Sequence, residues 1–214
     1  MLAGILAQVT DIKEAPKRIF TRMLETIGNI PLPSKVYLVG CGDSWVSGLC
    51  TKFVFEAWAG IPVEVVGSFE FANYRCQWAP KGSMVAAVSI SGRVSRTIEA
   101  VKIARSLGLV TVGGTANMDS VFSREVHFPV EFDYHERRFS PGTISYMYSL
   151  LFYYCLALFF ALRNGRMSIQ QVNNWLEKIA ALSQGMRATI DHNLIKLENM
   201  GAATSLDDRT IFVG

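Results

Sequence analysis

Apolar residues in this chain gather in short uncharged runs, and each run is followed by a longer stretch in which apolar residues recur with helical spacing. The run from Met84 to Val88 shows the pattern best. It is too short for an ordinary helix and carries no charge, so it predicts a strand buried on both faces of a parallel sheet. Strands of this kind are expected at residues 35–40, 62–66, 84–90, 109–113 and 126–130.

The stretches between these runs predict helices. Residues 95–107 place Ile98, Val101 and Ala104 on one face and charged residues elsewhere, which is the pattern of an amphipathic helix. Further helices are expected at 5–28 (interrupted at Pro16), at 45–59, from residue 68 onward, and at 119–124, 143–162 and 167–200. Strands that alternate with helices in this way need right-handed crossovers, and they predict a doubly wound α/β fold, a three-layer α/β/α sandwich.

The stretch from Phe139 to Leu162 carries no charge and is long enough to span a bilayer. Its tyrosines lie through the middle instead of at the ends, unlike an aromatic belt at a membrane surface. We therefore interpret it as a buried helix, with no membrane partner, and expect a second subunit or domain to cover one of its faces.

Composition narrows the function classes. Half of the 214 residues are hydrophobic and 18% are charged, which is typical of a globular domain and excludes disorder. The net charge is +3, and the basic residues form no stripe with aromatic ones, so no nucleic-acid partner is expected. Four scattered cysteines fit reduced thiols in a cytoplasmic protein, and neither a metal nor a cofactor is expected. The N-terminal residues lack the basic start of a signal peptide.

Two turns that follow predicted strands carry the candidate chemistry. Residues 89–95 offer the hydroxyls of Ser89, Ser91 and Ser95, and Gly92 allows a tight turn before a helix begins. The free N–H groups of that helix start favour an anion such as phosphate. The alternative is an ordinary strand-to-helix loop in which Ser95 caps the helix.

The second turn, residues 40–44, is also a strand, a glycine turn and a helix start. Here Asp43 or Ser44 is expected to cap the helix. The two turns end neighbouring strands at the carboxyl edge of the predicted sheet, where α/β sheets bind ligands. The Gly40-Cys41-Gly42 pair lacks the third glycine of a dinucleotide site.

Four stretches in order resemble the sugar isomerase (SIS) domain family, and most closely the first SIS half of the isomerase part of glutamine–fructose-6-phosphate aminotransferase. They are the turn Gly40-Cys41-Gly42-Asp43-Ser44, the stretch Ser68-Phe69-Glu70-Phe71, the loop Ser89 to Thr97, and Glu136 with Pro141-Gly142-Thr143 and its apolar helix. The resemblance implies a five-stranded parallel, flavodoxin-like sheet, and sugar-phosphate binding in an isomerase, aminotransferase or deaminase. A non-catalytic sugar-phosphate sensor is the alternative.

The resemblance also assigns residues. It implies a phosphate site at Ser44, Ser89, Ser91, Gly92 and Ser95. Further substrate contacts are expected at Cys41, Gly42, Asp43, Arg93 and Glu70. Glu136 is the candidate base, with Glu70 a weaker one.

The chain departs from the family pattern at several of these positions. Asp43 and Val94 replace threonines, and Ile90 and Arg93 replace glutamine and glutamate. Asp43 would repel a phosphate unless its carboxylate turned away, whereas Arg93 would attract one.

The expected organisation is a helical segment at 1–34, the SIS domain at 35–165 and a helical connector at 166–207. Residues 208–214 look like the start of a second SIS half. A homodimer or that second half is the expected protein partner.

Overall fold

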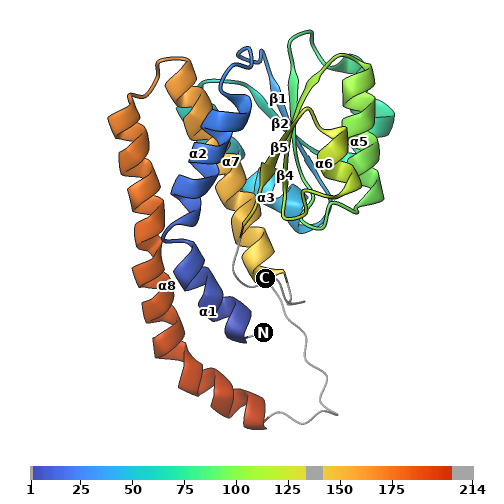
Figure 1. Cartoon of the computed structure of the whole chain (residues 1–214). Coiled ribbons are helices and arrows are strands. Elements are labelled where there is room, and N and C mark those ends of the chain that lie inside the picture. The colour runs from blue at the N-terminus through green and yellow to red at the C-terminus, as the bar shows by residue number, and fades with distance from the viewer. Residues whose placement is uncertain (1, 134–141, 204–214) are drawn as a thin grey trace.

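The computed structural model describes residues 2–133 and 142–203, and at its centre is a sheet of five parallel strands in the order β2-β1-β3-β4-β5 (Figure 1). The strands are β1 (Val36–Gly40), β2 (Val63–Gly67), β3 (Met84–Val88), β4 (Val110–Thr115) and β5 (Phe128–Glu131). The predicted α/β fold and flavodoxin-like order are confirmed. The sequence prediction for the third strand runs two residues too far, because the chain turns after Val88.

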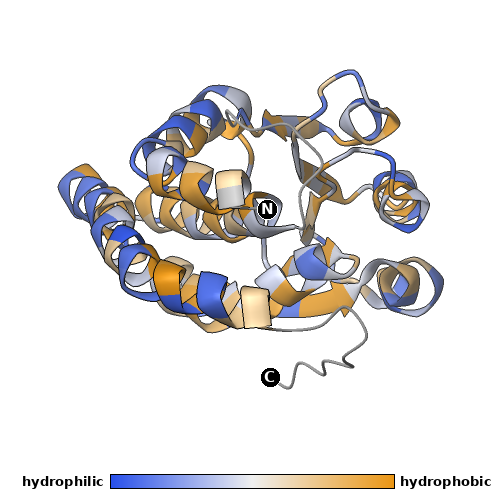
Figure 2. Ribbon diagram, turned by 90° about the horizontal axis from the view of Figure 1, so that it is seen from below, coloured by the Kyte–Doolittle hydropathy of each residue, from blue (hydrophilic) through white to orange (hydrophobic). Residues whose placement is uncertain are grey.

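The central strand β3 shows why these sequences form strands. All five of its residues are buried. Met84, Ala86 and Val88 point into one hydrophobic cluster, while Val85 and Ala87 point into the other. This is the two-residue period of a strand covered on both faces. Figure 2 shows the mostly hydrophobic strands between the two helical layers.

Helices cover both faces of the sheet. They are α1 (Leu2–Asp11), α2 (Ala15–Ile27), α3 (Asp43–Ala59), α4 (Ser68–Glu70), α5 (Ser95–Ser106), α6 (Val121–Glu125), α7 (Thr143–Arg163) and α8 (Ile169–Ala203). A π-helical turn at Phe71–Arg75 and a 3-10 turn at Cys76–Trp78 follow α4. One layer holds α2, α3 and α7, and the other holds α4, α5 and α6.

The N-terminal segment folds as two helices, and the break between them lies before Ala15, slightly earlier than the expected interruption at Pro16. Pro16 lies in the first turn of α2, where its missing N–H is not needed. On α2, Arg22 donates a hydrogen bond of 2.9 Å to the Glu131 carbonyl, and Arg18 donates one of the same length to the Asp133 carbonyl. These contacts tie α2 to the end of β5.

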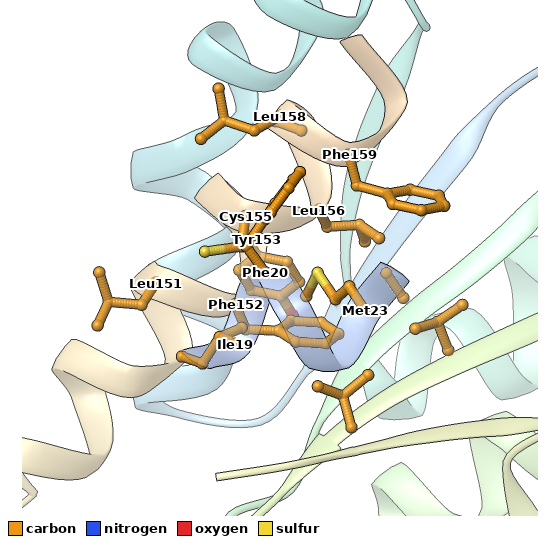
Figure 3. Packing of buried hydrophobic residues seen from close by; sticks show 14 of the residues in the cluster. Ile19, Phe20, Met23, Leu151, Phe152, Tyr153, Cys155, Leu156, Leu158 and Phe159 are labelled. Carbon is orange, nitrogen blue, oxygen red and sulfur yellow. The ribbon is translucent and has the colours of Figure 1, made fainter. Parts of the chain in front are cut away.

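The apolar helix α7 is covered by the chain itself. It packs against α3 and α2, with further contacts to α1 and α8. Figure 3 shows Phe152, Tyr153 and Leu156 of α7 packed with Ile19, Phe20 and Met23 of α2. It is the one helix of the described residues that is long and apolar enough to cross a membrane, and 78% of its most apolar window is buried. The expectation that α7 needs a partner subunit was therefore wrong, because the N-terminal helices and α8 fill that role.

The described residues include the predicted connector but not the predicted start of a second SIS half. The predicted connector helix corresponds to α8. Residues 208–214 lie outside the described residues, so the second SIS half stays a prediction.

Candidate functional site

The strand register brings several hydroxyl and thiol side chains to one edge of the sheet. Gly40 pairs with Gly67, Val39 pairs with Ala87, and Val88 pairs with Gly114. One step beyond these pairs, the carboxyl edge carries Ser68, Cys41, Ser89 and Thr115 side by side. Four parallel strands thus end in one row of small polar residues.

Thr97 ties this row to helix α5. Its hydroxyl and that of Ser68 share a hydrogen bond of 3.0 Å, and it also lies 3.7 Å from Cys41 Sγ, to which it can donate. Thr97 and Ser68 are both fully buried. The contacts fix the first turn of α5 against the ends of β1 and β2.

The β3–α5 loop has the turn that the sequence predicts. Gly92 has a φ of +65°. A Cβ atom here would lie 2.0 Å from Ser120 Oγ, so both the backbone conformation and the packing require glycine. The Gly92 N–H donates to the Ser89 carbonyl at 2.9 Å, and the Arg93 N–H donates to Ser91 Oγ at 3.3 Å.

The β1–α3 turn is also built around a glycine with positive φ. Gly42 has a φ of +56° and is the N-cap residue of α3. The prediction that Asp43 or Ser44 caps this helix is wrong, because Gly42 takes the cap position and α3 has no side-chain cap. Asp43 becomes the first helical residue, where its charge still favours the helix dipole.

Helix α5 begins at Ser95, the residue that was expected to cap it. Val94 is the N-cap residue, and no side chain caps the helix. Ser95 is already helical and exposed. The expectation that Ser95 caps this helix is therefore wrong, and the first N–H groups of α5 are left for another acceptor.

The Asp43 carboxylate points toward a different helix. A Cβ atom on Gly142, the N-cap residue of α7, would lie 2.6 Å from Asp43 Oδ2. The carboxylate therefore sits at the positive end of α7. Nearby, a 3.3 Å hydrogen bond between Tyr146 Oη and Cys50 Sγ raises the pKa of Tyr146 to about 12.

Ser89 is the most informative residue in the row. Its side chain is 1% exposed, and its hydroxyl has no hydrogen-bond partner among the described residues. Leaving a hydroxyl buried and unpaired costs about 1–3 kcal/mol. Such an atom beside two helix N-termini indicates an acceptor or donor that arrives with a ligand.

The other predicted site residues differ in how exposed they are. Ser44 is half-buried in the first turn of α3, while Ser91 and Arg93 are exposed on the β3–α5 loop. Glu70 is exposed on α4. Glu136 lies outside the described residues, so its role stays a prediction. Across residues 2–133 and 142–203, no group of three His, Cys, Asp or Glu side chains could hold a metal.

Sequence reasoning left out Thr97, Thr115 and Thr143 as site residues. Thr115 donates to the Ile90 carbonyl at 3.3 Å and so supports the loop from β4. Thr143 Oγ1, in the first turn of α7, is a second buried hydroxyl with no partner in the described part of the chain. Strand register could have identified Thr115, because it ends β4 at the same edge of the sheet where Ser89 follows β3.

A five-stranded parallel sheet with glycine turns after β1 and β3 is the arrangement expected of a SIS domain. Residues 33–159 match the SIS domain family model, and the chain belongs to that family. Over 158 residues it is 30% identical to a glutamine–fructose-6-phosphate aminotransferase of Caldanaerobacter subterraneus. The match covers 74% of this chain but only 26% of the relative.

Solved structures share the fold. The C-terminal domain of glucosamine-fructose-6-phosphate aminotransferase from Francisella tularensis superposes with a TM-score of 0.67 at 20% identity, covering 83% of this chain and 54% of that one. A protein of Escherichia coli, solved in complex with a sugar phosphate, gives a TM-score of 0.62 at 16% identity. That match covers 81% of this chain and 92% of the other.

Proposed function

We propose that this chain binds a hexose or aminohexose phosphate, as the SIS domain of an isomerase, aminotransferase or deaminase. The observation that carries the proposal is the buried, unpaired hydroxyl of Ser89 at the meeting point of two uncapped helix starts. A phosphate would supply the missing partner, and it would also accept from the free N–H groups of α3 and α5. The names of the relatives agree with this substrate class.

In this proposal the phosphate is held mainly by main-chain and hydroxyl donors. Ser44, Ser91 and Ser95 join Ser89, and the Gly92 turn aims the loop N–H groups. The exposed Arg93 adds a favourable charge at the mouth of the site. Asp43 does not oppose the phosphate, because its carboxylate lies against the start of α7.

Turnover requires more than a site that binds the phosphate. Aldose–ketose chemistry needs a base near C1 and C2 and donors for the developing oxyanion. Glu136 is our proposed base, and Glu70 a weaker alternative. We propose that a second SIS half or a second copy of the chain completes the site, in a cytoplasmic protein. The 214-residue chain by itself is expected to bind hexose phosphate weakly without interconverting glucose 6-phosphate and fructose 6-phosphate.

A charge placed in the loop tests the binding site. Ser91→Asp puts a carboxylate on the exposed loop surface, where it should repel a phosphate without disturbing the core. We expect calorimetric titration with glucose 6-phosphate to show no binding, while circular dichroism stays unchanged. Ser106→Asp, at the far end of α5, is the matched control and should bind as the wild type does. Unchanged affinity in Ser91→Asp would refute the proposed site.

A further inference from the structure

A cavity lies between helix α1 and the long helix α8. Helix α8 runs alongside α1 and α2 (Figure 1), and its contact with α1 leaves a space of about 580 Å³. We call this space the α1–α8 cavity. Its volume is typical of small-ligand sites, which span roughly 300–1,000 Å³. None of the residues that line it belongs to the two turns of the proposed phosphate site. The lining residues that matter below are Leu6, Val9, Lys13, Ser183, Arg187 and Ala188.

The cavity exists because α8 is anchored through its first half. Among the described residues of α8, the buried ones are Val172, Leu176 and Ser183, and none after Ser183 is buried. From Ser183 to Ala203 the helix continues for about 30 Å, at 1.5 Å per residue. This second half contacts α1 without closing the space between the two helices.

Ser183 brings a buried hydroxyl to the wall of the cavity. It is 5% exposed, yet its hydroxyl forms no hydrogen bond with any residue in 2–133 or 142–203. Serine in a helix can instead donate to the carbonyl four residues earlier, as Ser149 does to Ser145 at 2.9 Å. A buried hydroxyl without a partner costs free energy, and it indicates a partner that arrives from outside the chain.

The charges that line the cavity leave one cation without a partner. Arg187 donates to Asp191 through Nε at 2.9 Å, and its Nη2 lies 2.7 Å from the other carboxylate oxygen. These two charges therefore neutralise each other. Lys13 forms no ion pair with any described residue. The cavity thus carries a net positive charge at Lys13, which favours an anion.

Lys13 and Ser183 lie at the same end of the cavity. Lys13 also lines a second cavity, of about 220 Å³, together with Ala180. Ala180 precedes Ser183 by less than one helical turn. A single anionic group at this end can therefore accept hydrogen bonds from both the ammonium group of Lys13 and the hydroxyl of Ser183.

The rest of the cavity is partly apolar. Leu6 and Val9 line it from α1, and Ala188 lines it from α8. Val9 is already buried beneath this wall. An inorganic ion at Lys13 would leave these side chains without an apolar contact, whereas a ligand with an apolar body would cover them.

We propose that the α1–α8 cavity binds a small amphipathic carboxylate. Its acid group lies at Lys13 and Ser183, and its apolar body lies against Leu6, Val9 and Ala188. The ligand bridges α1 and α8, so it also holds the second half of α8 against the domain. The proposal does not depend on the sugar-phosphate function, because the two sites share no residue.

Calorimetric titration of the full chain with octanoate tests the charge. We expect binding at one site, and binding of 1-octanol, which has the same tail without the charge, about 10-fold weaker or more. Lys13→Met removes the charge and should weaken octanoate by the same factor. Lys17→Met is the matched control, because Lys17 is equally exposed and unpaired among the described residues but does not line the α1–α8 cavity. No binding of octanoate, equal affinity for octanol, or an unchanged affinity in Lys13→Met would overturn the proposal.

Filling the cavity tests its location. Ala188→Trp places a large side chain in the space from an exposed position, so the fold should survive and octanoate binding should be lost. Thr189→Trp is the matched control on the next, equally exposed residue, which does not line the cavity. Glucose 6-phosphate should behave alike with Ala188→Trp and with the wild type, which separates this test from that of the phosphate site. Octanoate that binds Ala188→Trp as tightly as the wild type would refute the location.

Hydrogen exchange and sedimentation complete the test. Octanoate should slow amide exchange in α8 after Ser183 in the wild type and have no such effect in Ala188→Trp. Unchanged exchange in the wild type would contradict the bridge between α1 and α8. A second copy of the chain as the occupant would appear in sedimentation as a dimer that octanoate dissociates, and that result would overturn the proposal.

Discussion

Replacing Ser89 with alanine should strengthen the fold and weaken the binding of phosphate. The hydroxyl is buried and has no partner in the described part of the chain, while the rest of the side chain packs normally. Alanine keeps the Cβ atom and removes the unpaired group. Because an unpaired buried hydroxyl costs about 1–3 kcal/mol, the free energy of unfolding should rise by at least ~1 kcal/mol. For a chain of this length, that raises the melting temperature by about 2–4 °C.

The same change removes a hydrogen bond to the ligand. A hydrogen bond to a charged group contributes about 1.5–3 kcal/mol, so the dissociation constant of glucose 6-phosphate should rise by roughly 10- to 100-fold. The two effects have opposite signs, which distinguishes a ligand-binding hydroxyl from a structural one. Thermal unfolding with and without ligand, together with calorimetric titration, measures both.

Ser83 provides a matched control at the other end of β3. It precedes β3 at the opposite edge of the sheet, is 2% exposed, and its hydroxyl is also unpaired among the described residues. Ser83→Ala should raise the melting temperature in the same way but leave the affinity for glucose 6-phosphate unchanged. The reasoning fails if Ser89→Ala lowers the stability, or if both variants bind as the wild type does.

Two further predictions concern single contacts. Thr111 donates its N–H to His127 Nδ1 at 3.1 Å, and burial with the nearby Arg105 charge lowers the pKa of His127. The unfolded state therefore binds the proton more readily, so the free energy of unfolding should fall as the pH drops below about 6.5 and through the lowered pKa of His127. Denaturant titrations of the wild type and His127→Asn at several pH values measure this. Equal pH dependence of stability in the two proteins would contradict it. Gly92→Ala should lose more than ~1 kcal/mol of stability, together with phosphate binding, because of its clash with Ser120. Gly108→Ala, with a similar φ of +74° and open space around it, isolates the backbone strain alone, and an equal loss in both variants would refute the clash.

The sheet could be predicted from the sequence because its signals are local. An uncharged run such as Met84 to Val88 has few other stable places in a folded chain than a sheet covered on both faces. The regular alternation with amphipathic helices then leaves few possible topologies. Glycines that permit a positive φ mark the two turns of the site, and both Gly42 and Gly92 have that conformation.

What the sequence could not supply depends on contacts between distant residues. The pattern of α7 showed that it must be covered all round, but the covering elements, α1, α2 and α8, are identified only by tertiary packing. The same holds for Thr97, whose link to Ser68 joins residues 29 positions apart. The N-cap predictions for α3 and α5 failed for a different reason. The N-cap position is set by where the preceding turn ends, and not by which nearby side chain is able to cap the helix.

The departures from the family pattern change side chains and leave in place the backbone of the proposed phosphate site. Its donors are mainly N–H groups at the starts of α3 and α5, and these remain whichever side chains Asp43 and Val94 carry. The altered side chains instead change which charges lie around the proposed site. Asp43 lies on the α3 side against the start of α7, and the exposed Arg93 lies on the α5 side. An anion is therefore favoured on the α5 side, next to Ser89, which is where the buried hydroxyl lacks a partner. The charge pattern and the unpaired hydroxyl are independent observations, and both favour the α5 side as the position of the proposed phosphate site.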